Sequence, residues 1–125
     1  MTFNPAKCIL LKFKPRSNQH DIATYSINNL PTFEKTSHRD LGIIFSVTLQ
    51  WRPHYENITA KAYKILAYYK EFLKTLSFEA KKLLYISLVR SCLLYCLPLW
   101  RPYLIQDILL LEKVQRRATK VILND

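Results

Sequence analysis

The apolar residues of this chain change their spacing near residue 50. After Gly42 no glycine interrupts the chain, and between residues 54 and 76 the apolar positions recur every three or four residues, as in an amphipathic helix. Before residue 50 the apolar residues form short runs rich in β-branched and aromatic side chains, which is typical of strands. The sequence therefore predicts an α+β fold, with strands in residues 1–50 and helices in residues 51–125.

Three strands are expected in the first part, at residues 7–14, 23–28 and 40–47. Each is a short run bounded by polar residues. The third contains Gly42, the single glycine of the chain, and a glycine within a strand commonly marks a bulge or a close approach of another backbone or a ligand. A simple bend is the alternative interpretation.

Three helices are expected in the second part, over about residues 54–76, 77–96 and 104–123. Ser77 is a suitable N-cap for the second helix, and Pro98 would stop it. Since residues 83–97 are apolar nearly all round, we expect this helix to be the most buried. It is too short and too interrupted to span a membrane, which needs about 20 mostly apolar residues.

The net charge of the chain indicates which classes of partner it favours. The chain carries 19 basic and 9 acidic residues, a formal net charge of +10, and the excess grows towards the C-terminus. This balance favours a polyanion such as nucleic acid, or an anionic membrane surface. A domain with an incidentally high pI is the ordinary alternative.

The clearest basic pattern lies in the third expected helix. Its basic residues are spaced i, i+3, i+4, i+7 and so fall within one arc of about 100°, beside an apolar arc that can pack inside the protein. The sequence predicts that this face meets phosphate groups; a solvated helix face is the alternative. The residues are Lys113, Arg116, Arg117 and Lys120.

Catalytic and metal-binding patterns are weak. Two-metal enzymes need closely grouped carboxylates, whereas the aspartates here are isolated in sequence. One glycine cannot build a phosphate-binding loop. The three cysteines lack zinc-type pairing and are interpreted as reduced thiols of an intracellular protein, in the nucleus or the cytoplasm. We therefore expect no cofactor and no metal site. The cysteines are Cys8, Cys92 and Cys96.

A series of short motifs adds a resemblance to a known family. Their order and spacing resemble the C-terminal part of a non-LTR retrotransposon reverse transcriptase of the LINE type, close to the jockey-like group. The motifs are Asn4-Pro5-Ala6-Lys7-Cys8, Asp40-Leu41-Gly42, His54, Lys61-Ala62, Leu88-Val89-Arg90, Tyr95, Trp100-Arg101-Pro102 and Glu112-Lys113-Val114-Gln115-Arg116-Arg117.

The resemblance implies a short antiparallel remnant of the polymerase palm followed by a three-helix, thumb-like bundle. It places the catalytic aspartates and their Mg²⁺ before residue 1, so the chain is expected to be an inactive fragment, not an enzyme by itself. Lys7 corresponds to the lysine that follows the catalytic strand in the family. Leu41 and Gly42 correspond to the primer grip.

The family also implies a ligand. Thumb helices of reverse transcriptases hold the primer–template duplex by its backbone, which gives affinity without sequence specificity. We therefore expect weak binding of an RNA–DNA or other duplex. The candidate contacts outside the basic helix are Lys61, Lys64, Trp51 and His54.

Two further expectations follow. Without the palm, one side of the strands and of the second helix would be exposed, which favours self-association.

The rival function is a small helical protein-interaction module with no nucleic-acid role. The salt dependence of binding distinguishes this function from nucleic-acid binding. Four phosphate contacts predict a slope of log K against log salt of about −3.6, whereas protein docking predicts little slope.

Overall fold

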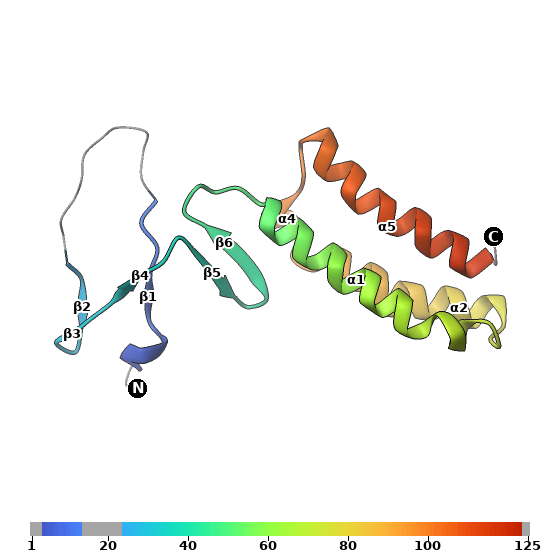
Figure 1. The fold of residues 1–125 in the computed structure, drawn as a ribbon, viewed down its shortest axis with the longest axis horizontal. Coiled ribbons are helices and arrows are strands. Elements are labelled where there is room, and N and C mark those ends of the chain that lie inside the picture. Colours follow the sequence, from blue (N-terminus) through green and yellow to red (C-terminus); the bar gives the residue numbers. More distant parts are fainter. Residues whose placement is uncertain (1–3, 14–23, 124–125) are drawn as a thin grey trace. The chain divides into compact units, whose positions relative to one another are not determined.

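The computed structural model describes residues 4–13 and 24–123. The chain forms two compact units that divide between Trp51 and Arg52, a strand unit and a helical unit (Figure 1). The α+β prediction is confirmed. No helix within the described residues is long and apolar enough to cross a bilayer.

The described residues of the strand unit form three two-stranded sheets. After a 3₁₀ turn (Pro5–Lys7), β1 (Ile9–Leu10) pairs in parallel with β4 (Phe33–Glu34). Between them in sequence, β2 (Ser26–Ile27) and β3 (Leu30–Pro31) form an antiparallel pair. Within the described residues, the expected strands at 7–14 and 23–28 are therefore shorter than predicted and do not pair with each other. Residues 14 and 23 of these predictions lie outside the described part of the chain. The antiparallel pairing that the resemblance implied is present in β2–β3 and in the third sheet, whereas β1 pairs in parallel with a strand that the sequence pattern did not show.

The third sheet is a hairpin of β5 (Ser37–Asp40) and β6 (Ile43–Ser46), with Asp40 opposite Ile43. Leu41 and Gly42 form its two-residue turn, and their φ angles of 46° and 84° suit the primed turns that match the twist of paired strands. The strand predicted at 40–47 is thus two strands and a turn. Gly42 is a turn residue and not a bulge, because both central residues of such a turn need the left-handed region.

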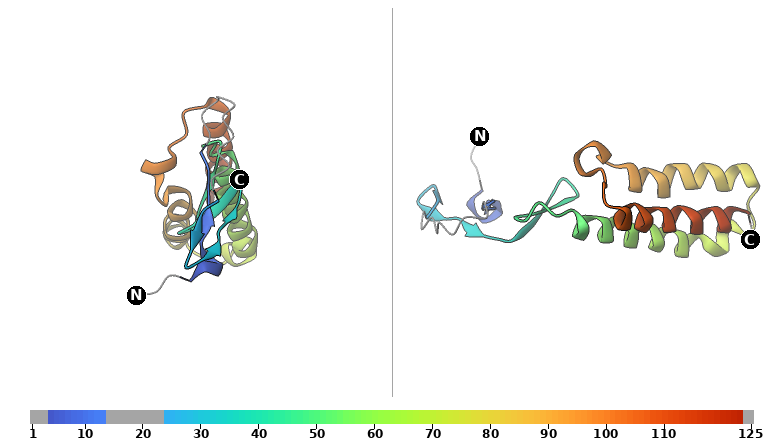
Figure 2. Two further views of the ribbon diagram at one scale, coloured as in Figure 1. Left: turned by 90° about the vertical axis from the view of Figure 1, so that its left-hand side faces the viewer. Right: turned by 90° about the horizontal axis from the view of Figure 1, so that it is seen from above.

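The described residues of the helical unit form three long helical segments, which lie alongside one another (Figures 1 and 2). The first is α1 (Arg52–Leu73). The second combines α2 (Phe78–Leu84), a π-helical segment (Tyr85–Arg90) and α3 (Ser91–Leu94) in one continuous run. After the short α4 (Leu97–Trp100), the third is α5 (Ile105–Leu123).

The ends of the second helix follow local chemistry. The Ser77 hydroxyl accepts a hydrogen bond from the backbone N–H of Ala80 at 3.4 Å, so the predicted N-cap is confirmed. The helix ends at Leu94, two residues before the predicted end. Cys96 then takes a left-handed φ of 54°, a conformation that an α-helix cannot continue through.

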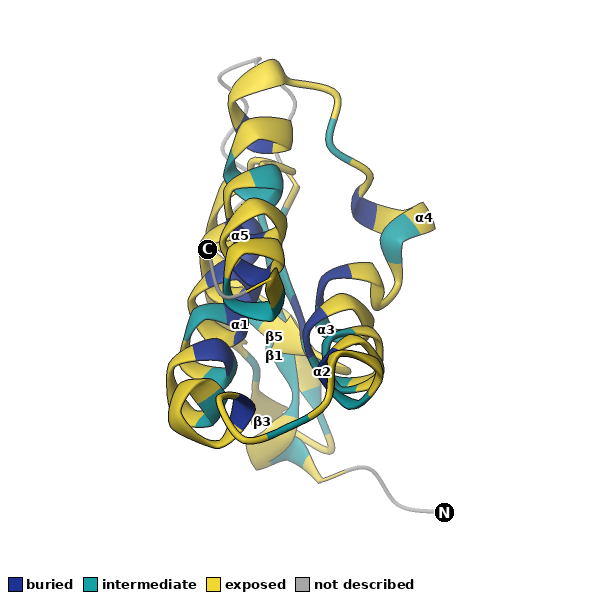
Figure 3. Cartoon of the chain, turned by 90° about the vertical axis from the view of Figure 1, so that its right-hand side faces the viewer, coloured by how far each residue is buried: buried dark blue, intermediate teal, exposed yellow. Residues whose placement is uncertain are grey.

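The core of the helical unit is centred on α1, not on the second helix. Seven residues of α1 are buried, because α1 packs against both α5 and the second helix. In Figure 3 the buried positions lie mainly on the sides of the three helices that face one another. The prediction that the second helix is the most buried is wrong. Its outer apolar residues are not covered by any element among the described residues of this unit and are exposed: Leu83, Ile86 and Leu94.

An aromatic cluster fixes one end of the bundle. Trp100 is fully buried between His54 and Tyr55, with ring centroids 5.1 and 5.8 Å away. The Tyr55 hydroxyl donates a hydrogen bond to the Trp100 carbonyl at 2.8 Å, and the Trp100 indole N–H donates to the Tyr95 carbonyl at 2.9 Å. These contacts join α1 to the segment that leads into α5.

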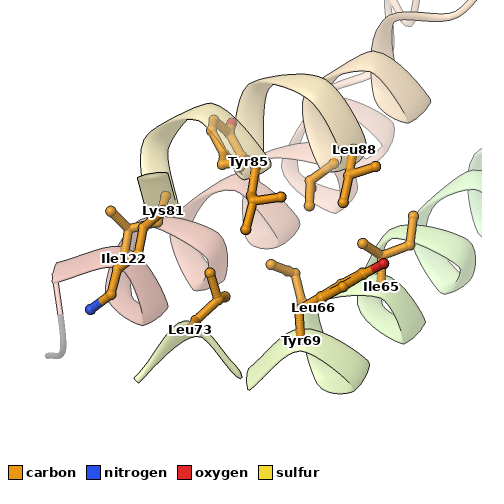
Figure 4. Close-up of a pocket in the computed structure, with 10 residues that line it drawn as sticks. Ile65, Leu66, Tyr69, Leu73, Lys81, Tyr85, Leu88 and Ile122 are labelled. Carbon is orange, nitrogen blue, oxygen red and sulfur yellow. The ribbon is translucent and has the colours of Figure 1, made fainter. Parts of the chain in front are cut away.

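An apolar cavity lies towards the other end of the bundle, between α1, the second helix and α5 (Figure 4). Lys81 is 4% exposed and lines it; its amino group points away from the middle of the cavity (Figure 4). A lysine can cover apolar side chains in this way with its aliphatic stem. The cavity therefore belongs to the core. Its labelled lining residues include Leu66, Leu73, Tyr85 and Ile122.

Candidate nucleic-acid interface

A groove runs along the helical unit between α1 and α5 and has a volume of about 950 Å³. The two helices lie side by side and run in the same direction (Figures 1 and 2). Its less exposed lining residues, which we call the floor, are apolar or aromatic: Leu66, Tyr63 and Val121. Its five basic lining residues are exposed and form the margins. The lining residues are Tyr63, Leu66, Ala67 and Lys70 from α1, and Lys113, Arg116, Arg117, Lys120 and Val121 from α5.

The sequence of α5 explains how the groove forms. Val114 and Ala118 are fully buried, and they occupy the apolar arc that packs inside the unit. Small residues permit close approach of two helices, and Ala62 on α1 is also fully buried. The basic residues lie beside this packed arc, so they border the groove and remain exposed.

The groove is strongly positive. It is lined by five basic side chains, and Glu112 neutralises one of them through an ion pair with Arg116 at 2.9 Å. Four net positive charges remain. The C-terminal ends of α1 and α5 lie towards the same end of the groove, and each contributes only about half a negative charge. The basic side chains therefore dominate, and an anion is attracted.

The five basic side chains are not equivalent. Within the residues that the structure describes, Lys70, Lys113 and Lys120 form no ion pair. The Arg117 guanidinium lies 5.7 Å from the centroid of the Tyr63 ring, within the range of a cation–π contact. Arg116 is held by Glu112. Lys70, Lys113 and Lys120 are therefore the groups best placed to meet phosphate directly.

The structure brings the four predicted residues of α5 together on this groove. Lys61 and Lys64 are exposed on α1 but do not line it, because at 100° per residue they lie about 160° and 100° around the helix from Tyr63. Lys70 and Tyr63 were missed by the sequence reasoning. Their spacing of seven residues, which returns to one helix face, was the available signal.

The aromatic candidates are placed elsewhere. His54 is only 1% exposed, so its ring belongs to the core cluster around Trp100 and offers no surface to nucleic acid in this structure. Trp51 belongs to the strand unit, where it is half-buried and packs edge-on against Phe45 with ring centroids 5.7 Å apart.

The other family-derived positions also belong to the strand unit. Lys7 is exposed at the end of the 3₁₀ turn, not on a strand. Leu41 and Gly42 form the hairpin turn, with Leu41 81% exposed. The roles suggested for these three residues stay predictions.

The described residues contain no group of three or more His, Cys, Asp or Glu side chains that could hold a metal ion.

An ion pair between Arg52 and Asp107, at 2.9 Å, joins the starts of α1 and α5. Hydrogen bonds to Glu56 and Asp107 raise the pKa of Arg52. This pair orients the two helices that form the groove.

Comparisons with known proteins do not extend this description. No protein-family model matches the chain, and neither a curated protein nor a solved structure matches it significantly. The comparisons therefore neither support nor oppose the resemblance to reverse transcriptases.

Proposed function

We propose that this chain binds nucleic acid without sequence specificity, through the groove between α1 and α5. On this proposal it is the palm end and thumb-like part of a non-LTR retrotransposon reverse transcriptase, and it holds an RNA–DNA or other duplex by the backbone. It acts as a binding element and not as a polymerase by itself, as the resemblance to the family implies.

The observation that carries the proposal is the concentration of charge in one place. Basic side chains from two helices border a single groove, and one of the five is neutralised. Lysine and arginine bind phosphate oxygens whatever the base sequence. A scattered basic surface would give the same net charge without such a site.

The salt dependence of binding tests the proposal. We expect the affinity for a labelled RNA–DNA duplex to fall with salt with a slope of about −3.6, which corresponds to four phosphate contacts at about −0.9 each. The groove variant replaces four basic residues by alanine and should lose most of this slope. Its substitutions are Lys70→Ala, Lys113→Ala, Arg117→Ala and Lys120→Ala.

A charge-matched control removes four exposed basic residues outside the groove and should bind nearly as well as the wild-type protein. Equal losses in both variants would show that only net charge matters, and a slope near zero would refute phosphate binding. The control substitutions are Lys61→Ala, Lys82→Ala, Arg90→Ala and Arg101→Ala.

A second candidate function rests on a different surface. The outer side of the second helix exposes apolar residues in a row, with Leu83 67% and both Ile86 and Leu94 42% exposed. Such a row suits docking of another protein or of a second copy. Binding through it would be little affected by salt, and substitution of all three residues by serine would abolish it without weakening nucleic-acid binding.

A further inference from the structure

The floor of the groove is better suited to a nucleobase than to a phosphate. Leu66 and Val121 make it apolar, and Tyr63 adds an aromatic ring. The backbone of a fully paired duplex needs only the basic margins. An unpaired strand can also place its bases or sugars against an apolar, aromatic floor while its phosphates meet the basic side chains.

We infer that Tyr63 is a stacking position for an unpaired base, so that the groove favours nucleic acid with unpaired nucleotides over fully paired duplex. This inference rests on the proposed function and specifies its ligand. Tyr63 is partly exposed, and the Arg117 guanidinium lies 5.7 Å from the centroid of its ring.

The contact with Arg117 does not prevent stacking. An exposed cation–π pair contributes a factor of about two to five to an equilibrium, whereas a base stacked on an aromatic side chain contributes about five- to hundredfold. A base therefore displaces the guanidinium from the ring or stacks on its opposite side. Once displaced, Arg117 gains the freedom to bind a neighbouring phosphate.

The length of the groove agrees with this arrangement. Tyr63 and Lys70 are seven residues apart on α1, about 10 Å along the helix axis. One strand of a duplex carries a phosphate about every 3.4 Å along the axis, and an unpaired strand can be more extended, so at most about three phosphates lie over that distance. One stacked base and the phosphates beside it thus fit within the site.

The test compares three ligands: a single strand, a blunt RNA–DNA duplex, and the same duplex with an unpaired overhang. Tyr63→Leu should weaken binding of the single strand and the overhang about five- to hundredfold and leave the blunt duplex nearly unchanged. Tyr63→Phe keeps the ring and should bind all three like the wild-type protein. The advantage of the overhang should persist at high salt, because stacking is not screened.

The outcomes separate this inference from the proposed function. Salt-dependent binding of all ligands, with no selective effect of Tyr63→Leu, would overturn the stacking site and leave phosphate binding intact. Equal weakening of all three ligands by Tyr63→Leu would also overturn it. If the wild-type protein binds none of them at low salt, the proposed function fails and the stacking site fails with it. Thermal unfolding of both variants shows whether they are folded.

Discussion

The helical and strand units of this chain differ in how they are stabilised. Of the eleven buried apolar residues among those described, ten lie in the helical unit and one, Ile43, lies in the strand unit. A helix satisfies its backbone hydrogen bonds locally and needs only one apolar face covered. The described strands have two residues each, or four in the β5–β6 hairpin, and therefore form few backbone hydrogen bonds. Two-stranded sheets are only marginally stable without further strands or a covering helix. The helical unit therefore has the core that fixes a binding site.

The largest expected effect is the loss of stability of the helical unit when the buried ring of Trp100 is removed. Trp100→Ala removes a fully buried ring that packs against His54 and Tyr55, and it should lower the free energy of unfolding of the helical unit by about 3–5 kcal/mol. Denaturant titration followed by helical circular dichroism measures it. Trp51→Ala, in the strand unit, is the matched control and should change this transition by less than about 1 kcal/mol. Similar losses from both would show that the two units share one core.

A smaller effect on stability is expected from ionisation of the Tyr55 hydroxyl at alkaline pH. Burial raises the pKa of its hydroxyl, so the folded protein keeps this proton at a pH where the unfolded chain loses it. The stability that depends on it is complete below the unfolded pKa of about 10 and falls as pH rises above that value. Thermal unfolding at alkaline pH should show this decline.

Tyr55→Phe should make that decline shallower and should lower stability at neutral pH by about 1–3 kcal/mol, because the Trp100 carbonyl loses its donor. Tyr68→Phe, at a residue that is 81% exposed, is the control and should change neither quantity. If the stability of Tyr55→Phe falls at alkaline pH as steeply as that of the wild-type protein, the decline comes from other groups.

The hairpin turn tests the strand unit alone. Gly42 has a φ of 84°, and Gly42→Ala should destabilise the hairpin by about 1 kcal/mol. Leu41→Asn should stabilise it by a similar amount, because asparagine before glycine is favoured in primed turns. Amide hydrogen exchange across β5 and β6 would show opposite changes in the two variants. Altered exchange in α1 or α5 would contradict the expectation that these substitutions affect the strand unit alone.

The smallest expected effect concerns Glu112. Glu112→Gln removes the ion pair with Arg116, which should cost at most about 0.5 kcal/mol of stability. It also makes Arg116 available to phosphate, so the slope of log K against log salt should become steeper by about 0.9. Glu79→Gln, on the second helix, is the control. An unchanged slope would place Arg116 outside the contact with nucleic acid.

The sequence predicted the helices better than the strands. The three-and-four spacing of α1 and α5 is a local pattern, as is the cap at Ser77, so these elements lie within a few residues of their expected bounds. The pairing of β1 with β4 is not local, and two-residue strands carry too little alternation to reveal it. The hairpin at Leu41 and Gly42 was missed because its first strand, Ser37–Asp40, is polar.

The residues of the candidate site were predicted only in part, because the sequence shows patterns within one helix but not the packing between two helices. The four basic residues of α5 share one helix face, which spacing alone indicates. Lys70 and Tyr63 join them only because α1 packs along α5, and no pattern within a single helix shows that packing. His54 was placed on the surface by its neighbourhood in sequence, whereas its face of α1 is turned towards Trp100.

The central claim is that the groove between α1 and α5 is where nucleic acid binds. The most direct test is to follow backbone amide NMR shifts of the full chain during titration with an RNA–DNA duplex that carries an unpaired overhang. We expect the largest shifts to cluster around Tyr63, Lys70, Lys113, Arg117 and Lys120. The largest shifts along Leu83, Ile86 and Leu94, or no shifts at low salt, would contradict it.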